Sequence, residues 1–212
     1  MDMNISYAIT VHNEHTELTT LLNVISRFFK ETDEIVIVTD KSTKLVDDVI
    51  DHFHFSTFPI KCRPHLLNGD FATHKNFLIE QCSKDYIFQI DADEYPNDYI
   101  MTNLHTILTN NSHIDLFRVP RINVVNGITD QHIKKWNWGL KKNGWINFPD
   151  YQSRLFRNNE TIKWINKVHE VITGNENITV LPPREEYCLY HIKDIHKQET
   201  QNELYEKIIF NK

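Results

Sequence analysis

The sequence contains little glycine: only five glycines occur in 212 residues, and none of them falls in a GxGxxG, GxxxxGKS or GxxxxGKT pattern. Glycine-rich loops of these kinds allow a backbone to approach a pyrophosphate closely. The sequence therefore carries no support for a dinucleotide-binding Rossmann domain or a P-loop.

Cysteine is also scarce. The three cysteines, Cys62, Cys82 and Cys188, are an odd number at wide spacings, and no two of them form a CxxC pair. Disulfide frameworks and zinc sites use paired or closely spaced cysteines. The pattern is typical of reduced, packed thiols in a cytoplasmic protein, and that is where we expect this protein to lie.

Excess positive charge and long apolar runs are missing as well. The net charge of −6 argues against a nucleic-acid partner, which would require clustered lysine and arginine. The first residues lack the basic and then apolar pattern of a signal peptide. No apolar run approaches the ~20 residues that span a bilayer. The length suits one α/β domain with a sizeable core.

Hydrophobic patterning predicts strands that alternate with helices over the first half of the chain. Strands are expected at 5–11, 34–39, 57–62 and 86–90, and helices at 18–29, 45–53 and 71–82. Such alternation is typical of right-handed βαβ units and a mostly parallel sheet. Residues 121–150 show weak periodicity, so irregular structure and short strands are expected there, followed by a helical tail over 195–210.

Polar residues follow three of the four predicted strands. Thr10 to Glu14 form the end of the first strand and the residues after it, Asp40 follows the second strand, and Asp91 to Glu94 follow the fourth. Ligands of open parallel sheets bind outside the carboxyl ends of the strands. These residues are therefore predicted to line one site. Asn13 is also expected to cap the helix that follows it.

Asp91 and Asp93 are two residues apart, so in an extended segment their side chains share a face. Two carboxylates on one face repel each other unless a cation or a buried donor compensates them. Carboxylate oxygens are the ligands that Mg²⁺ and Mn²⁺ prefer. We therefore interpret the pair as a metal site for phosphate binding. The plainer alternative is that Asp91 caps a turn and Asp93 is solvated.

The order and spacing of six short motifs resemble glycosyltransferase family 2, and more narrowly its lipopolysaccharide-core β-glycosyltransferase branch. The resemblance runs from Ile5 to about His191. The chain departs from the family in lacking most of the usual C-terminal extension, and in having Lys75 where an arginine often precedes the asparagine. The motifs are Thr10–Glu14, Asp40–Thr43, Asp70–Asn76, Asp91–Glu94, Phe148–Phe156 and Val168–Glu170.

The resemblance implies the GT-A fold, a Rossmann-like α/β domain over residues 1–212. Residues 1–120 would form the half that binds the nucleotide sugar, and 121–212 the half that binds the acceptor. Asp40 would accept the uracil imide N–H of a uridine nucleotide, although it can also be a plain turn residue. The remaining donor-binding residues would be Thr10, Asn13, Glu14, Lys75 and Asp91.

The resemblance also implies a divalent cation, Mn²⁺ or Mg²⁺, held by Asp93 with help from Asp91. His169 and His191 are candidate additional ligands, because imidazole nitrogen suits Mn²⁺ passably. A carboxylate must serve as general base for the acceptor hydroxyl. Asp150 is favoured because its segment resembles the place where the fold usually puts its base, at the start of a helix. Glu170 is the alternative, or else it orients His169.

The function expected from these features is metal-dependent, inverting transfer of a sugar from a nucleoside diphosphate sugar, with UDP as the expected carrier. The acceptor would be a hydroxyl of a glycan or glycolipid, and peripheral contact with a membrane is compatible with such an acceptor. A catalytically inactive nucleotide- or sugar-binding module of the same fold is one alternative. A sugar nucleotidyltransferase is another, but the loop at His12–His15 lacks the glycine-rich, basic character that such enzymes use. Four tryptophans remain open between sugar stacking and core packing: Trp136, Trp138, Trp145 and Trp164.

Overall fold

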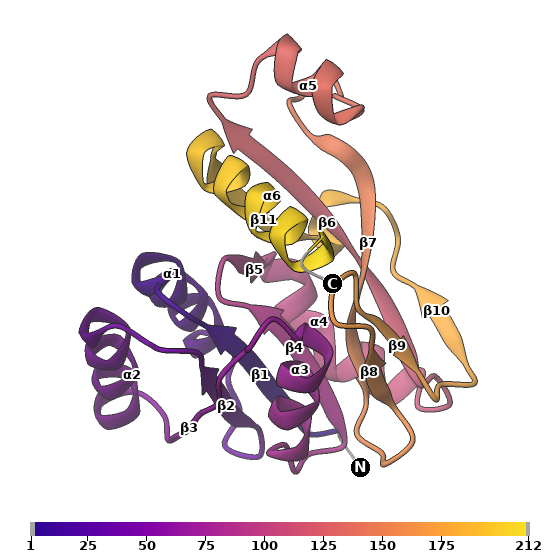
Figure 1. The fold of residues 1–212 in the computed structure, drawn as a ribbon. Helices are drawn as coiled ribbons and strands as arrows, with labels where there is room; N and C mark the ends of the chain where they lie inside the picture. Colours follow the sequence, from indigo (N-terminus) through magenta and orange to yellow (C-terminus); the bar gives the residue numbers. More distant parts are fainter. Residues whose placement is uncertain (1–2, 211–212) are drawn as a thin grey trace.

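A computed structural model describes residues 3–210 of the chain (Figure 1). Its first half alternates strands and helices, as the sequence predicts. The elements are β1 (Ile5–Val11), α1 (His15–Ser26), β2 (Glu34–Thr39), α2 (Lys44–Ser56), β3 (Ile60–Pro64), α3 (Phe71–Glu80) and β4 (Tyr86–Asp91). Strands β3, β2, β1 and β4 pair in that order and in parallel.

The second half adds most of the remaining strands to the same sheet. Its elements are β5 (Glu94–Pro96), α4 (Asp98–Asn110), β6 (Leu116–Asn126), α5 (Asp130–Trp136), β7 (Ile146–Arg157), β8 (Lys163–Ile165), β9 (Val171–Thr173), β10 (Ile178–Val180), the 3-10 helix η1 (Glu185–Tyr187), β11 (Leu189–Asp194) and α6 (Ile195–Phe210). The sheet continues from β4 as β7, β6, β11 and β5, with β10 beside β6. Five strand pairings in it are parallel and three are antiparallel. The expected mostly parallel α/β sheet is therefore confirmed.

Helices cover both faces of the parallel strands, which explains why these strands are apolar on both sides. On β1, Ile5, Tyr7 and Ile9 pack into a core with residues of α1, α2 and α4. Ala8, which points the other way, packs with residues of α3 and with Trp164. The charged residues that face the site therefore lie at the ends of these strands, whereas the buried polar residues within them are the uncharged Ser6 and Gln89. Among the residues that the structure describes, no helix is both long and apolar enough to cross a membrane.

Three local predictions were wrong. Helix α1 begins at His15 after Glu14, so Asn13 does not cap it, and the cap position makes no side-chain cap hydrogen bond. The Glu14 carboxylate instead accepts the backbone N–H groups of His12, at 2.8 Å, and Asn13, at 3.0 Å. The third strand begins at Ile60 rather than at residue 57, because α2 continues to Ser56 and Thr57 follows as its cap.

The third error concerns 121–150, which is more regular than its weak periodicity indicates. Strand β6, with 11 residues, and β7, with 12, are longer than the other described strands. They pair as an antiparallel ribbon with two register shifts, and α5 lies between them at the top of Figure 1. Partly buried polar residues along both strands obscure the alternation of apolar and polar positions that identifies a strand.

Candidate active site

Two neighbouring cavities lie at the carboxyl-terminal edge of the parallel strands. The smaller, about 190 Å³, is lined by residues that follow β1 and β2, among them Thr10, Glu14 and Asp40. The larger, about 640 Å³, is lined mainly by residues of β6, β7 and β11. Five residues line both cavities and therefore mark where they meet: Lys75, Asp91, Asp93, Glu170 and Gln201.

The smaller cavity contains most of the predicted nucleotide-binding residues. The Thr10 hydroxyl donates to Asp91 at 3.1 Å. Asp40 accepts the backbone N–H of Leu67 at 3.1 Å, so one of its carboxylate oxygens holds the loop that closes the cavity. Its other oxygen lies 3.8 Å from the His12 imidazole. Asn13 is exposed and is not among the residues that line this cavity.

Lys75 on α3 joins the two cavities. Its ammonium group donates to the Glu170 carboxylate and lies 3.9 Å from Asp91. The group also lies 4.7 Å from the ring centre of Trp164, whose indole N–H donates to Gln89 at 2.8 Å. A buried ammonium needs this compensation, because removing a charge from water is costly unless the charge is paired. The arrangement leaves Lys75 rigid and facing the shared edge.

A buried arginine compensates the acidic residues that follow β4. Arg154 on β7 donates to Asp91, and at 2.7 Å to Glu94, whose side chain is fully buried. Burial alone would raise the pKa of Asp91, but Arg154, Lys75 and Arg121 hold it well below its usual range. Asp91 is therefore a carboxylate at any physiological pH, and it is already paired within the protein.

Asp150 lies in the middle of strand β7, so the expectation that it begins a helix was wrong. Its carboxylate accepts from Arg121 at 2.7 Å and 2.9 Å, from Asn123 at 2.8 Å and from Gln152 at 2.7 Å. Burial raises the pKa of Asp150, but Arg121 and the two amides lower it by more than burial raises it. The pKa of Asp150 therefore lies below its usual range. Both oxygens of Asp150 are thus occupied by donors.

Asp93 faces His191 of β11 across the edge of the sheet, with 3.3 Å between its carboxylate and the imidazole Nε2. The other ring nitrogen, Nδ1, lies 2.8 Å from Asn123, which fixes the ring orientation. Lys197 of α6 lies 3.8 Å from the same carboxylate. Burial raises the pKa of Asp93, and the contacts with His191 outweigh that effect, so its pKa lies well below the usual range.

Asp93 and His191 are positioned to share one cation, since a carboxylate oxygen and an imidazole nitrogen at this separation can both bind it. Within residues 3–210, no three His, Cys, Asp or Glu side chains gather as a ready metal site. His169 lines the larger cavity beside Glu170 and has a left-handed backbone with φ of 53°. The residues present fit a cation that draws its remaining ligands from phosphate and water.

Sequence reasoning missed the basic and amide residues that organise the larger cavity. Arg154 lies within a motif that the family resemblance includes, yet nothing in the sequence indicated its role. Arg121 and Asn123 had no signal at all, because they face the cavity only after β6 pairs with β7. Of the four tryptophans, Trp138 and Trp164 both line the larger cavity, and Trp164 is also buried beneath Lys75.

Comparison with known proteins agrees with this architecture. The structure resembles that of S. aureus TarS 1–349 in complex with UDP, with a TM-score of 0.64 at 16% identity, over 99% of this chain and 66% of that chain. The same protein in complex with UDP-GlcNAc gives a TM-score of 0.63 at 16% identity, over 91% of this chain and 59% of that one. At this identity the likeness concerns the fold alone, and it confirms the expected GT-A architecture.

A sequence relative is the SPbeta prophage-derived glycosyltransferase SunS of Bacillus subtilis (strain 168). It is 25% identical over 166 residues, which are 78% of this chain and 34% of SunS. The chain thus spans about a third of the length of the curated relative that it matches. The family model described as "Glycosyl transferase family 2" matches residues 6–175. With most of its length matched, the chain belongs to glycosyl transferase family 2.

Proposed function

We propose that this protein transfers a sugar from a nucleoside diphosphate sugar to a hydroxyl group of a glycan or glycolipid, with inversion at the anomeric carbon. The observation that carries the proposal is the meeting of two cavities at one charged edge, formed by Lys75, Asp91, Asp93 and Glu170. The smaller cavity suits the nucleotide and the larger the acceptor. The sugar would then be transferred at their shared edge, where its bond to the diphosphate breaks and its bond to the acceptor oxygen forms.

In this proposal the donor is UDP-linked, and Asp40 accepts the uracil imide N–H. Its carboxylate lines the smaller cavity and has one oxygen 3.8 Å from His12. Membership of the family supports the reaction class. The complexes of TarS with UDP and with UDP-GlcNAc make a uridine donor the first to test.

A divalent cation, Mn²⁺ or Mg²⁺, would be held by Asp93 and His191, with Asp91 nearby. Bound there, it would act as a Lewis acid that neutralises charge on the diphosphate. Lys75 supplies positive charge on the other side of the diphosphate, between the two cavities. Lys197, now 3.8 Å from Asp93, would move away or bind a phosphate oxygen itself.

We assign the general base to Glu170 in preference to Asp150. Asp150 accepts four hydrogen bonds over its two oxygens, which lowers its basicity and leaves little room for an acceptor hydroxyl. Glu170 lines both cavities, and the Lys75 ammonium is paired with its Oε1. As the acceptor oxygen attacks the anomeric carbon, its proton passes to Glu170, and the bond to the diphosphate breaks on the opposite face. Asp150 then positions Arg121 and Asn123.

The test is calorimetric titration of UDP in Mn²⁺ and in EDTA, followed by a transfer assay with UDP-sugars. We expect UDP to bind much more tightly with Mn²⁺, and Asp93→Asn to remove the difference. Equal affinity in Mn²⁺ and EDTA would exclude the role of the metal. Failure of every uridine donor in binding would exclude the assigned nucleotide. Tight donor binding without any transfer would favour an inactive binding module of the same fold.

A further inference from the structure

The far end of the β6–β7 ribbon, which we call the tip, comprises residues 127–148. It projects beyond the rest of the sheet and carries α5 (Figure 1). It is an ordered unit. Thr129 and His132 form a capping box at the start of α5, and Asn137 ends the helix in the left-handed conformation. In the turn that follows, the backbone N–H of Lys141 donates to the carbonyl of Trp145 at 2.9 Å, and the N–H of Gly144 donates to the carbonyl of Lys141 at 3.0 Å.

The tip packs its aromatic residues against one another and not against the main core. The Trp136 and Trp138 rings lie 4.8 Å apart, and the Trp145 and Phe148 rings 4.7 Å apart. All four side chains are partly exposed, α5 has no buried residue, and Leu140 is 48% exposed. Trp136 and Trp145 do not line the larger cavity, so sugar stacking in that cavity does not account for them.

The charge of the tip is opposite to that of the remaining chain. The tip holds four lysines, Lys134, Lys135, Lys141 and Lys142, and one acidic residue, which gives it a net charge of +3. Since the whole chain carries −6, the other residues carry −9. All four lysines are exposed. A negatively charged surface would therefore attract the tip and repel the rest of the molecule, which sets a single orientation.

We propose that the tip docks the protein onto a bilayer containing anionic lipids. Tryptophan rings favour the boundary between headgroups and acyl chains, because one edge of the ring is polar and the remainder apolar. Clusters of four or more lysines bind anionic headgroups. A soluble polyanion would pair with the lysines, but it would not bury the exposed apolar surface of the tryptophans and Leu140. The combination of both features selects the bilayer.

Docking would bring the membrane close to the larger cavity, because Trp138 and Asn147 of the tip also line that cavity. The consequence for the acceptor rests on the proposed function: a lipid-linked sugar hydroxyl would enter from the docked side. The docking itself does not depend on it. Vesicle binding can be measured without donor or acceptor, so its failure would leave the transfer reaction untouched.

The experiment is co-sedimentation of the full chain with vesicles of phosphatidylcholine alone, and of phosphatidylcholine with phosphatidylglycerol. We expect binding only to the anionic vesicles, weakening as salt is added. Three of the four tryptophans lie in the tip, so their emission should shift to shorter wavelength on binding.

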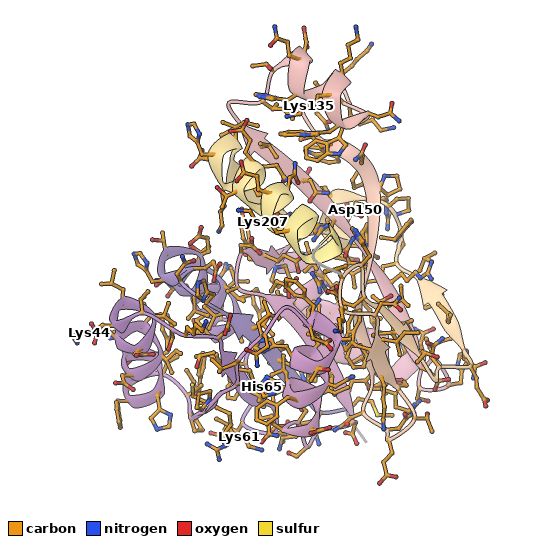
Figure 2. The ribbon with its side chains drawn as sticks, in the orientation of Figure 1. Lys44, Lys61, His65, Lys135, Asp150 and Lys207 are labelled. Atoms are coloured by element: carbon orange, nitrogen blue, oxygen red, sulfur yellow. The ribbon has the colours of Figure 1, made fainter. Side chains whose placement is uncertain are left out.

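The double variant Lys134→Glu, Lys135→Glu should bind at least about thirty-fold more weakly, on the basis of about 1 kcal/mol for each lysine near an anionic surface. Lys141→Glu, Lys142→Glu repeats the test on the turn, in case the first pair disturbs α5. The matched control is Lys44→Glu, Lys163→Glu, which changes the same charge at exposed positions outside the tip. Figure 2 shows Lys135 on the tip at the top of the view and Lys44 on α2 at its left edge.

Three results would overturn the proposal: no binding to the anionic vesicles, equal weakening by the control and tip variants, or binding without any change in tryptophan emission. A competition experiment with inorganic polyphosphate tests whether the tip binds any polyanion. If polyphosphate displaces the protein from vesicles and binds as tightly as they do, the tip is a general anion site and not a membrane-docking surface.

Discussion

The two sides of the site are built on different principles. On the proposed donor side, β1, β2 and β4 are mostly apolar, with the buried Ser6 and Gln89 as polar exceptions, and their charged site residues come where each strand ends. On the acceptor side, β6 and β7 carry charged residues within the strands, and Figure 2 shows Asp150 partway along β7. The first arrangement needs only a parallel sheet. The second needs each buried charge to find its partner on another strand.

This difference separates residues that bind from residues that hold the site together. Asp40 and Glu170 line cavities and keep part of their carboxylates available. The guanidinium groups of Arg154 and Arg121 instead form ion pairs with Glu94, Asp91 and Asp150. Substitutions should therefore fail in different ways: those of Asp40 and Glu170 in ligand binding or transfer, and those of Arg121 and Arg154 in stability.

The largest expected effect is on transfer. Glu170→Gln should lower kcat by about a hundred- to ten-thousand-fold, the usual contribution of a general base, and leave UDP affinity unchanged. Asp150→Asn, which keeps its shape and loses one charge, should lower kcat by less than about a hundredfold if Asp150 only positions its neighbours, because it is then not the general base. Steady-state kinetics with a UDP-sugar would measure both. The reverse ranking would make Asp150 the base.

Stability gives the next largest effect. Arg154→Met removes one of the two arginine partners of the fully buried Glu94, and it removes the guanidinium group that donates to Asp91. The loss should lower the free energy of unfolding by up to about 3–5 kcal/mol. Arg27→Met is the matched control on the donor half. Arg27 and its partner Asp98 are 51% and 57% exposed, and an exposed pair contributes about 1 kcal/mol or less. Urea unfolding followed by circular dichroism measures both. Similar losses would contradict the distinction between the two sides.

Loss of uracil recognition by Asp40 should have a moderate effect on nucleotide affinity. Asp40→Ala should weaken UDP binding about ten- to a hundred-fold, because a hydrogen bond to a charged group is lost. GDP serves as the control ligand, since a loose Leu67 loop would weaken both nucleotides. Titration calorimetry distinguishes the two explanations. An equal loss of affinity for UDP and GDP would mean that Asp40 only holds the Leu67 loop and does not recognise uracil.

The smallest effect is a pH dependence from Lys193 on β11, which is 8% exposed. Burial lowers its pKa from 10.5 to about 8, with Arg121 and Lys197 also lowering it and Asp93 opposing them. Between about pH 8 and pH 10 the unfolded chain therefore binds more protons at this residue than the folded chain, so its contribution to stability rises with pH. Relative to Lys193→Met, the native protein should gain about 1–2 kcal/mol over that interval. If the difference in free energy of unfolding between the native protein and Lys193→Met does not change with pH, the lowered pKa of Lys193 is disproved.

The sequence by itself determined the first half of the chain, for which we propose donor binding, and the chemistry of its edge. Its β-branched runs and helical repeats predict β1 to β4 and α1 to α3 because each such element buries an apolar face of fixed period. Parallel strands end on one edge, so Asp40, Asp91 and Asp93 had to lie near one another. The prediction for Asn13 failed because a local detail, the backbone bonds of Glu14, decided where α1 begins.

Only the tertiary structure decided the second half of the chain, for which we propose acceptor binding. Whether a polar residue in a strand faces solvent, a cavity or a partner charge depends on its neighbouring strand, and the antiparallel insertion of β7 between β4 and β6 had no local signal. That insertion brings Arg154 to Glu94, and Arg121 to Asp150, across 60 and 29 residues of sequence. Pairing over such separations follows from the burial of opposite charges, which a single stretch of sequence does not display.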